Sequence, residues 1–242
     1  MTGLARPRQT GSTCRYVNHL IITGGSGGLG QAVIDAFTAP DWQIIAPRHS
    51  ELDLNDTQAI HEYLKTSPVD LLVAAAGLIR DAPLARLNEE AWEEVISVNY
   101  RAAAACAAAV LPTMIEQRRG HLVFISSFSA IHPGIGQVAY ATAKAALLGL
   151  TTSLAQQVGT HGIRVNAILP GFLETRMTAP VTAERKAEIL ANHTLGRLNT
   201  PVAVAKLIHF LHENLPHTSG QVFQLDSRIS QFYQLNYPDE SF

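Results

Sequence analysis

The stretch that decides the fold is HLIITGGSGGLGQAVIDAF, which runs from His19 to Phe37. It begins with an apolar run of strand length, residues 19–23, and continues into a loop, residues 24–30, that holds five glycines. Apolar residues at helical spacing follow, so the order is strand, glycine loop, helix. Such a loop presents backbone N–H groups and a helix N-terminus, which together bind a phosphate. The segment predicts a nucleotide-binding unit, with a plain tight turn as the alternative.

The rest of the chain alternates apolar runs of strand length with helical patterns. Further strands are expected at residues 42–46, 69–75, 121–125, 164–169 and 221–225. Further helices are expected after an N-cap at Asn88 and at residues 57–65, 100–117, 140–158, 182–192 and 201–213. The alanine-rich helix among them should break or bend near Pro112. Strands that are apolar throughout are typical of a parallel sheet covered on both faces, so we predict an α/β fold with one doubly wound sheet.

One domain is expected from a chain of 242 residues that is 47% hydrophobic. We place it at residues 17–226, after an irregular or disordered lead at residues 1–16. A C-terminal tail, residues 227–242, shows no clear period and carries four aromatic residues, Phe232, Tyr233, Tyr237 and Phe242. These aromatics would dock on a neighbouring subunit or cover a pocket, unless the tail is a frayed terminus.

Composition and charge exclude several classes of function. A formal charge of −2 leaves no basic surface for nucleic acid. The longest apolar run, residues 102–111, is too short to span a membrane, and residues 1–16 lack the apolar core of a signal peptide. Two cysteines, Cys14 and Cys106, are too few for a disulfide framework and fit a reducing compartment. We expect a cytoplasmic protein that binds neither nucleic acid nor membrane.

Three histidines lie close together near the end of the chain, at His209, His212 and His217. A metal site would need buried ligands that converge on one point. The first two histidines are three residues apart on an expected helix, a spacing that is typical of a solvated helix face. We therefore expect no metal site.

The unusual residues of the chain all follow expected strands. The glycine loop follows the first strand, Gly77 follows the strand at 69–75, Ser127 follows the next, and Pro170-Gly171 follows the one after that. In doubly wound sheets, ligands bind at the carboxyl ends of the strands. The rule places these residues together at one edge of the sheet.

A proton-transfer group is indicated by SFSAIHPGIGQVAYATAK, residues 127–144. If this segment ends in a helix, Tyr140 and Lys144 lie on one helix face at positions i and i+4. An ammonium beside a phenol favours the phenolate, so the tyrosine would be a proton donor with a lowered pKa. Ser127 would hydrogen-bond the same substrate oxygen. A solvated helix face is the alternative interpretation of the tyrosine and lysine.

The residue after the second strand indicates which dinucleotide is bound. An acidic residue there binds a ribose 2′-hydroxyl, whereas an arginine accepts a 2′-phosphate. Arg48 stands 18 positions after Gly30 and is followed by His49. NADP(H) is therefore favoured over NAD(H), with an ordinary surface arginine as the alternative.

In order and spacing, these motifs resemble the classical short-chain dehydrogenase/reductase family over roughly residues 20–226. The matching residues form the glycine loop, the helix asparagine, the catalytic serine with its YxxxK, and the PG…T segment: Thr23–Gly30, Asn99, Ser127, Tyr140, Lys144 and Pro170–Thr175. The resemblance implies a Rossmann-type sheet and an oxidoreductase that uses a nicotinamide cofactor.

The resemblance also implies a role for each matching residue. Four would be catalytic: Tyr140 would give a proton to a carbonyl oxygen held by Ser127. Lys144 would bind the nicotinamide ribose and lower the tyrosine pKa, while Asn99 would anchor a water. The cofactor-binding residues would be Gly24, Ser26, Gly28, Leu29, Gly30, Arg48, Asp53, Leu54, Ala76, Gly77, Tyr140, Lys144, Pro170, Gly171, Leu173 and Thr175.

Three departures separate the chain from the family pattern. Ala74-Ala75-Ala76-Gly77 replaces Asn-Asn-Ala-Gly, so two amide side chains are gone and their hydrogen bonds need compensation. Residues 48–53 are too few for a parallel crossover, so the helix between strands two and three should be missing or much shortened. A vestigial strand at Leu52-Asp53-Leu54 would remain to contact adenine. Asp226-Ser227-Arg228 replaces Asp-Gly-Gly and changes the packing expected at the C-terminus.

Within the family, the segments GIRVNAILPGFLET, LGRLNTPVAVAKLIHFL and SGQVFQLD resemble 3-oxoacyl-[acyl-carrier-protein] reductases. This implies an NADPH-dependent carbonyl reductase of fatty acid biosynthesis that reduces 3-oxoacyl thioesters. An acyl carrier protein would be its partner, and a homodimer or homotetramer its assembly. Two alternatives stay open: an NAD-dependent alcohol or sugar dehydrogenase of the same family, and a non-catalytic dinucleotide-binding protein.

Overall fold

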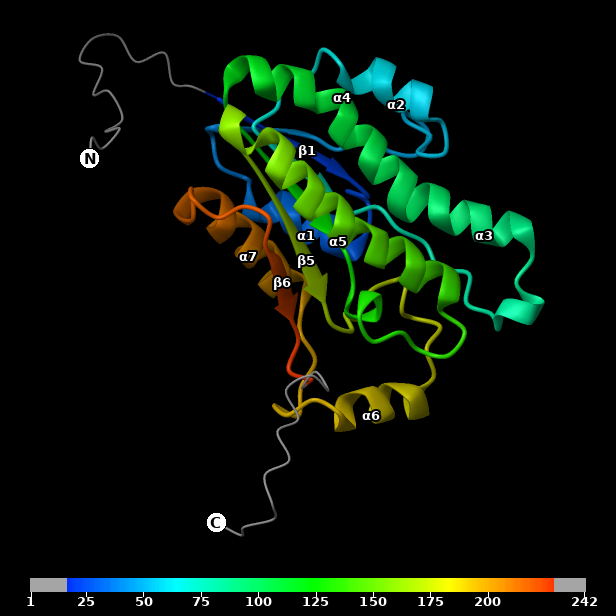
Figure 1. The fold of residues 1–242 in the computed structure, drawn as a ribbon. Helices are drawn as coiled ribbons and strands as arrows, with labels where there is room; N and C mark the ends of the chain where they lie inside the picture. The colour runs from blue at the N-terminus through cyan, green and yellow to red at the C-terminus, as the bar shows by residue number, and fades with distance from the viewer. Residues whose placement is uncertain (1–16, 229–242) are drawn as a thin grey trace.

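A parallel sheet of six strands forms the centre of the molecule, in the order β2-β1-β3-β4-β5-β6 (Figure 1). The structure is a computed structural model that describes residues 17–228. The strands are β1 (Asn18–Thr23), β2 (Trp42–Ile45), β3 (Leu71–Ala74), β4 (Gly120–Ile125), β5 (Ile163–Pro170) and β6 (Val222–Leu225). The chain runs outward from β1 to β2 and then returns to the other side at β3, so the order reverses between β1 and β3. The predicted doubly wound α/β fold is confirmed.

The lead at residues 1–16 and the four tail aromatics lie outside the described residues. Their expected roles therefore stay predictions.

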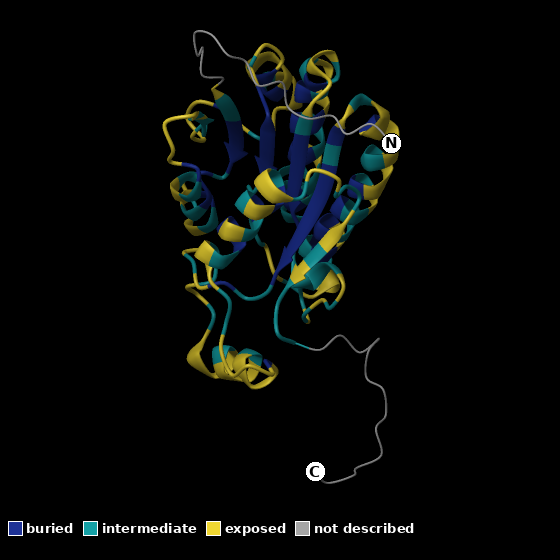
Figure 2. Cartoon of the chain, turned by 90° about the vertical axis from the view of Figure 1, so that its left-hand side faces the viewer, coloured by how far each residue is buried: buried dark blue, intermediate teal, exposed yellow. Residues whose placement is uncertain are grey.

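Helices cover both faces of the sheet (Figure 1). On one face lie α2 (Thr57–Leu64), α4 (Ala102–Gln117) and α5 (Val138–Val158), and on the other lie α1 (Gly28–Ala36) and α7 (Pro201–Asn214). The remaining helical segments are α3 (Glu89–Ile96), α6 (Ala183–Ala191), η1 (Leu84–Arg86), η2 (Ser97–Arg101), η3 (Phe128–Ala130) and η4 (Gly159–His161). Figures 1 and 2 show α6 standing beyond the carboxyl edge of the sheet, and none of its residues is buried.

Alternate side chains of each inner strand enter opposite core layers. In β1, Ile21 packs with α2, α4 and α5, whereas Leu20 and Ile22 pack with α1 and α7. Burying one such side chain contributes about 1.5–3 kcal/mol. Both faces of the inner strands are dark blue in Figure 2, which explains why these strands are apolar throughout.

Side-chain caps start four of the helices. The side-chain oxygens of the cap residues accept hydrogen bonds from backbone N–H groups two or three residues later, and these residues are Asp56, Asn88, Thr182 and Thr200. The cap predicted at Asn88 is confirmed.

The vestigial strand predicted at Leu52-Asp53-Leu54 is wrong. The segment forms a turn between β2 and α2, and Asp53 Oδ1 accepts a hydrogen bond of 2.9 Å from the Asn55 N–H group. Leu52 is buried in the core beside α2. No helix separates β2 from this segment, as predicted, because so short a link cannot form a parallel crossover. Among the described residues, β2 is therefore one of the two edge strands of the sheet, with β6 at the other edge.

The helix does not break at Pro112, one of the two outcomes predicted there. Pro112 lies inside α4, which continues to Gln117. Val110 and Met114, on either side of it, are fully buried in the core, and this packing holds the helix together at the proline. The irregularity lies earlier, at η2, where Ser97–Arg101 form one turn of π-helix between α3 and α4.

The histidines of α7 do not form the solvated face that their spacing predicted. The ring of His209 lies 5.0 Å from that of Phe37, and the ring of His212 lies 5.2 Å from that of Trp42. His212 also stacks on His121, a fully buried residue of β4, at 5.6 Å. Helix α7 packs on α1 and on the sheet, so both histidines face the core.

Acid should destabilise the fold through His121 and His212. Burial lowers the pKa of His212 to about 4 and that of His121 well below its usual value, and the charge of nearby Arg164 lowers both pKa values further. His209 also lowers the pKa of His212. A base whose pKa falls on folding stabilises the protein fully above the unfolded pKa near 6.5 and loses that contribution as pH falls toward 4.

For His212 alone, the loss at pH 5 is about 2 kcal/mol relative to pH 7. Urea unfolding of the His212→Gln variant should therefore show a smaller drop in the free energy of unfolding between pH 7 and pH 5 than wild type shows. His61→Gln, at an exposed position on α2, should keep the wild-type drop. An equal drop in His212→Gln and wild type would contradict the assignment.

Candidate active site

The glycine loop between β1 and α1 is packed too closely for larger residues at two positions. Gly24 has a φ of +73°, and a Cβ there would lie 2.8 Å from the Cα of Ala76. A Cβ on Gly30 would lie 2.1 Å from the carbonyl oxygen of Gly24. The loop therefore folds tightly over the start of α1, whose N-terminal N–H groups are suited to bind a phosphate.

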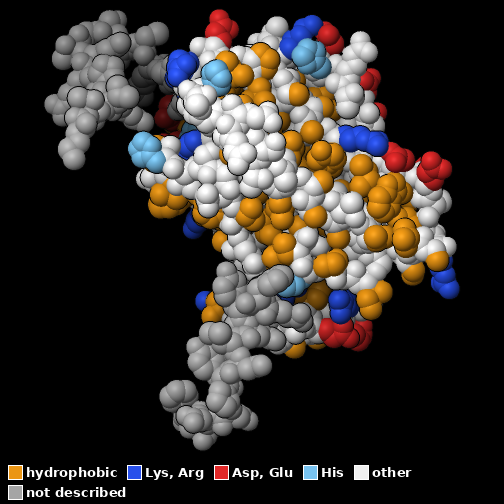
Figure 3. Space-filling view, viewed as in Figure 1, with side chains coloured by type: hydrophobic (Ala, Val, Ile, Leu, Met, Phe, Trp, Pro, Cys, Tyr) orange, Lys and Arg blue, Asp and Glu red, His pale blue; other side chains and the backbone are white. Residues whose placement is uncertain are grey.

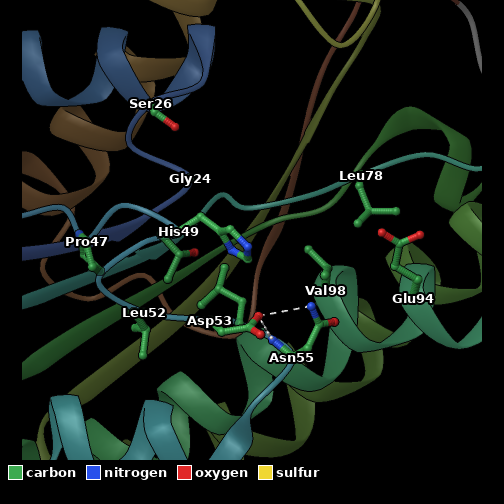
Figure 4. A pocket seen from close by; sticks show the side chains of 12 residues that line it. Gly24, Ser26, Pro47, His49, Leu52, Asp53, Asn55, Leu78, Glu94 and Val98 are labelled. Carbon is green, nitrogen blue, oxygen red and sulfur yellow. Dashed lines mark hydrogen bonds between the residues drawn. The ribbon is translucent and has the colours of Figure 1, made fainter.

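A cleft of about 230 Å³ opens beside this loop (Figure 4). Figure 4 shows His49 and Asp53, from the segment after β2, on one side and Leu78 and Val98 on the other. The complete lining is Thr23, Gly24, Ser26, Pro47, His49, Leu52, Asp53, Leu54, Asn55, Leu78, Glu94 and Val98. A glycine loop, a half-apolar cleft and an exposed carboxylate at Asp53 suit the phosphate, base and ribose of a dinucleotide.

Arg48 lies beside the cleft but is not among its lining residues. Its side chain is exposed, and its backbone N–H group donates to a Glu51 carboxylate oxygen at 2.7 Å. His49, the next residue, does line the cleft.

Lys144 is a deeply buried charged residue of the carboxyl edge, with 3% of the residue exposed. Its Nζ donates to the Ile125 carbonyl oxygen at 2.9 Å and lies 5.7 Å from the ring centre of Tyr140. The Ser126 hydroxyl donates to the Lys144 carbonyl oxygen at 2.7 Å, which fixes α5 against the end of β4. The structure thus brings Ser127, Tyr140 and Lys144 together, as the sequence predicted.

Burial dominates the electrostatics of this pair. Desolvation lowers the pKa of Lys144 to about 8. Desolvation also raises the pKa of Tyr140, with a smaller rise from the charge of Asp81, and a hydrogen bond with Ser127 offsets part of it. The net pKa of Tyr140 is thus raised rather than lowered as expected, because loss of hydration disfavours the phenolate more than its surroundings stabilise it.

Asn99 lies in the π-helical turn η2 and is 1% exposed. Its Nδ2 donates to the carbonyl oxygens of Leu78 at 2.8 Å and Val95 at 2.9 Å. Its Oδ1 is buried without a hydrogen-bond partner among the described residues. A Cβ on Gly77 would lie 2.7 Å from that Oδ1 and 3.5 Å from the Lys144 Nζ. The asparagine oxygen and the ammonium therefore border one small space that only a glycine leaves open, and both suit a bridging water.

The segment Ala74–Gly77, in which two alanines replace the family's amide residues, packs against the glycine loop. The Ala76 N–H group donates to the Thr23 hydroxyl at 3.3 Å, which ties this segment to the end of β1. Ala76 also packs directly under Gly24.

The segment after β5 reaches the glycine loop. A Cβ on Gly28 would lie 3.2 Å from the Thr175 Cγ2, so these two predicted cofactor residues are neighbours. Leu173 is buried and pairs with Asn199 in an isolated bridge. Leu29 packs in the core layer of α1 and α7. Pro170 ends β5 at the same edge of the sheet.

Comparison with known proteins identifies the family. The model of the short chain dehydrogenase family matches residues 49–186, which is more than half of the chain. The chain belongs to the short-chain dehydrogenases.

Two relatives of this short-chain dehydrogenase are 3-oxoacyl-[acyl-carrier-protein] reductases. That of Thermotoga maritima is 34% identical over 236 residues, covering 86% of this chain and 96% of the relative. That of Escherichia coli K12 is 34% identical over 217 residues, covering 79% and 88%. The similarity extends over nearly the full length of both proteins.

Two solved structures share the fold and have bound cofactors. A protein of Beutenbergia cavernae described as an NAD(P)-dependent gluconate 5-dehydrogenase, with bound NADP, superposes with a TM-score of 0.82 at 28% identity, covering 88% of this chain and 98% of that one. A 4-hydroxyisoleucine dehydrogenase complexed with NADH gives 0.80 at 28% identity, covering 87% and 97%. The present chain is thus an oxidoreductase with a nicotinamide dinucleotide fold.

The altered C-terminal segment of this short-chain dehydrogenase forms a buried ion pair. The Asp226 carboxylate is fully buried and accepts hydrogen bonds from the Nε and Nη2 of Arg228. It also lies 3.1 Å from the Nε2 of His193. The Arg228 guanidinium stacks 3.6 Å above the ring of Phe128, the residue after Ser127. The cluster ties the segment after α6 to the end of β6, a role that sequence reasoning did not find.

Sequence reasoning also missed Asp81 and Gln137. Asp81 follows β3 in the loop beyond Gly77, and Gln137 immediately precedes α5. The rule that ligand-binding residues follow parallel strands would have included Asp81. Nothing in the spacing of Gln137 pointed to it, because its contact with Asp81 joins residues 56 positions apart in the sequence.

Proposed function

We propose that this protein is an NADPH-dependent carbonyl reductase that converts 3-oxoacyl thioesters to 3-hydroxyacyl thioesters. The observation that carries the proposal is the contact of Tyr140 with Ser127 and Lys144 at the carboxyl edge, beside the dinucleotide cleft. A phenol, a hydroxyl and an ammonium at that edge suit protonation of a carbonyl oxygen.

In this proposal, Tyr140 gives its proton to the substrate oxygen while Ser127 donates a hydrogen bond to the same oxygen. The phenol is protonated before the reaction, and the raised pKa of Tyr140 means that its proton leaves only as the substrate oxygen gains negative charge. The Lys144 ammonium, held by the Ile125 carbonyl, stabilises negative charge on the tyrosine as its proton leaves. A water between the Asn99 Oδ1 and Lys144 would return a proton from solvent.

The cofactor contacts follow from the geometry of the loop and cleft. Gly24, Ser26 and Gly28 would hold the pyrophosphate, and Asp53 with Leu54 would contact the adenosine. When bound there, a nicotinamide dinucleotide supplies the hydride.

The choice of NADPH rests on Arg48, whose exposed side chain at the cleft is able to reach a ribose 2′-phosphate. The second candidate function, an NAD-dependent alcohol or sugar dehydrogenase, is favoured by a different observation. Asp53 lines the cleft whereas Arg48 does not, and an acidic residue suits an unphosphorylated ribose.

The substrate class rests on the relatives. Both reductases named above carry 3-oxoacyl-[acyl-carrier-protein] in their names, and the similarity spans nearly their whole length. An acyl carrier protein is accordingly the proposed natural carrier of the substrate, in the cytoplasm and in fatty acid biosynthesis.

We also propose that the chain forms a homodimer or homotetramer through α4 and α5. Two helical stretches, Glu89–Gln117 and Val138–His161, are long and apolar enough to cross a membrane by length and composition. One face of each stretch packs on the core. Only 44% and 33% of the most apolar part of each stretch, respectively, is buried. Figure 3 shows hydrophobic side chains spread over the face that these helices form. A second copy of the chain would cover that surface.

The reaction predicts that Tyr140→Phe abolishes activity. With NADPH and acetoacetyl-coenzyme A, kcat should fall by about 10²- to 10⁴-fold, because the proton donor is lost. NADPH binding, followed by cofactor fluorescence, should stay close to wild type. If wild type binds NADPH but reduces no 3-oxoacyl thioester, alcohol or sugar oxidation with either cofactor is the next assay. Inactivity in every assay would favour the non-catalytic alternative.

Cofactor choice predicts a selective effect of Arg48→Ala. The KM for NADPH should rise about tenfold, the value of one charged hydrogen bond, while the KM for NADH stays unchanged. Arg86→Ala, an exposed arginine of η1, is the matched control and should change neither constant. Wild-type KM values for NADH below those for NADPH would instead support the NAD-dependent alternative.

The proposed assembly predicts that Gly149→Glu yields smaller particles. Gly149 is exposed on α5, and a Cβ there meets nothing within the monomer, so the fold tolerates the change. A buried charge in a subunit interface would be strongly unfavourable. Light scattering should therefore show a lower mass for Gly149→Glu, while Leu190→Glu, at an exposed apolar position of α6 outside both stretches, keeps the wild-type mass. A monomeric wild type would contradict the assembly.

A further inference from the structure

A chain of hydrogen bonds links the loop after β3 to the catalytic serine. The Gln137 Nε2 donates to the Asp81 Oδ2 at 3.2 Å. The Gln137 Oε1 accepts from the Ser129 hydroxyl at 3.0 Å and from the Gly134 N–H group at 3.2 Å. The Ser129 N–H group then donates to the Ser127 Oγ at 3.1 Å. The chain ends at the oxygen that contacts Tyr140.

The Asp81 carboxylate fixes which groups along this series of hydrogen bonds donate and which accept. An ionised carboxylate only accepts hydrogen bonds, so Asp81 selects the NH₂ side of the Gln137 amide. The amide oxygen must then face Ser129, whose own N–H group occupies one lone pair of the Ser127 Oγ. With that lone pair occupied, the Ser127 hydroxyl is oriented to donate its proton to a substrate oxygen or to Tyr140.

A backbone contact holds the two loops in register. The Ala82 N–H group donates to the Gly136 carbonyl oxygen at 2.9 Å, directly beside the Asp81–Gln137 contact. Asp81 belongs to an exposed stretch, but its neighbours shield the carboxylate enough to raise its pKa, against the lowering effect of the Gln137 hydrogen bond.

The charge of Asp81 also acts directly on the catalytic tyrosine. It raises the pKa of Tyr140, as expected for a negative charge near a group that must become negative. The titratable groups around Tyr140 are Lys144 on its own helix, Asp81 from the loop after β3, and Tyr100 from η2, which shares its apolar cluster.

We propose that Asp81 is a positioning residue of the reaction: through Gln137 and Ser129 it orients the Ser127 hydroxyl toward the substrate oxygen. The inference rests on the proposed carbonyl reduction, since it assigns Asp81 a part in that same step. Asp81 itself touches neither the substrate nor the cofactor in this assignment.

Three variants separate the positioning effect from the charge effect. Asp81→Asn removes the charge and lets the Gln137 amide adopt either orientation. Gln137→Leu breaks the hydrogen-bond chain but keeps the carboxylate. Both should lower kcat for acetoacetyl-coenzyme A by about ten- to a hundredfold, with a smaller change in KM, because misorientation affects the transition state. Glu116→Gln removes a charge from an exposed site on α4 and should match wild type.

The pH profile distinguishes positioning from mere structural support. Removing the negative charge lowers the pKa of Tyr140, so the alkaline limb of kcat should move to lower pH in Asp81→Asn. The limb should stay in place in Gln137→Leu, which retains Asp81. The pKa of Tyr140 can also be followed without substrate, by titrating the absorbance of its phenolate. That signal is the difference between a protein with Tyr140 and the same protein carrying Tyr140→Phe. That titration should shift to lower pH in the Asp81→Asn background.

Failure of this inference and failure of the proposed function would give different results. A kcat for Asp81→Asn within about twofold of wild type, together with an unshifted tyrosinate titration, would overturn the inference and leave the proposed function intact. Full activity of Tyr140→Phe would overturn the proposed function itself. A lower kcat with an unshifted limb in Asp81→Asn would also count against the inference, because any loosening of the loop would give that result.

Discussion

The burial of the Lys144 ammonium is the constraint on which the site depends. A charge taken out of water is tolerated only where polar partners are held in place, and here the Ile125 carbonyl at the end of β4 is one such partner. Ser126 fixes the lysine backbone, and the absence of a side chain at Gly77 leaves space beside the ammonium. The same dry surroundings lower the pKa of Lys144 and raise that of Tyr140, so the two pKa values move apart. The phenol therefore holds its proton more firmly than the ammonium does.

Close backbone approach organises the neighbouring cofactor side of the site. Gly24 lies against Ala76, Gly28 against Thr175, and Gly30 against the Gly24 carbonyl. These contacts join the ends of β1, β3 and β5, so the cleft is shaped by three strands at once. The π-helical turn η2 contributes in the same way, because it places Asn99 facing Gly77 rather than along the regular face of a helix.

The two edges of the sheet use buried polar groups differently. At the carboxyl edge, Lys144, Asn99 and the Asp81–Gln137 chain keep polar atoms available for chemistry. At the amino edge, His121 stacks on His212, and Arg164 donates to the last carbonyls of α7 at 2.7 to 3.0 Å. The amino edge therefore stabilises the fold in a pH-dependent way, and the carboxyl edge carries the proposed reaction.

The sequence alone determined the strand–loop–helix order, the parallel sheet and the meeting of Ser127, Tyr140 and Lys144, because local periodicity and strand-end position encode all three. It correctly predicted that no helix lies between β2 and residues 52–54. It wrongly predicted a strand at Leu52–Leu54, since a strand forms only beside a neighbouring strand and the sequence does not show which segments become neighbours. Only the tertiary structure decided the direction of the Tyr140 pKa, the inward histidines of α7, and the contacts of Asp81 with Gln137 and of Asp226 with Arg228. These depend on burial and on residues distant in the chain, and both are fixed only when the elements pack together.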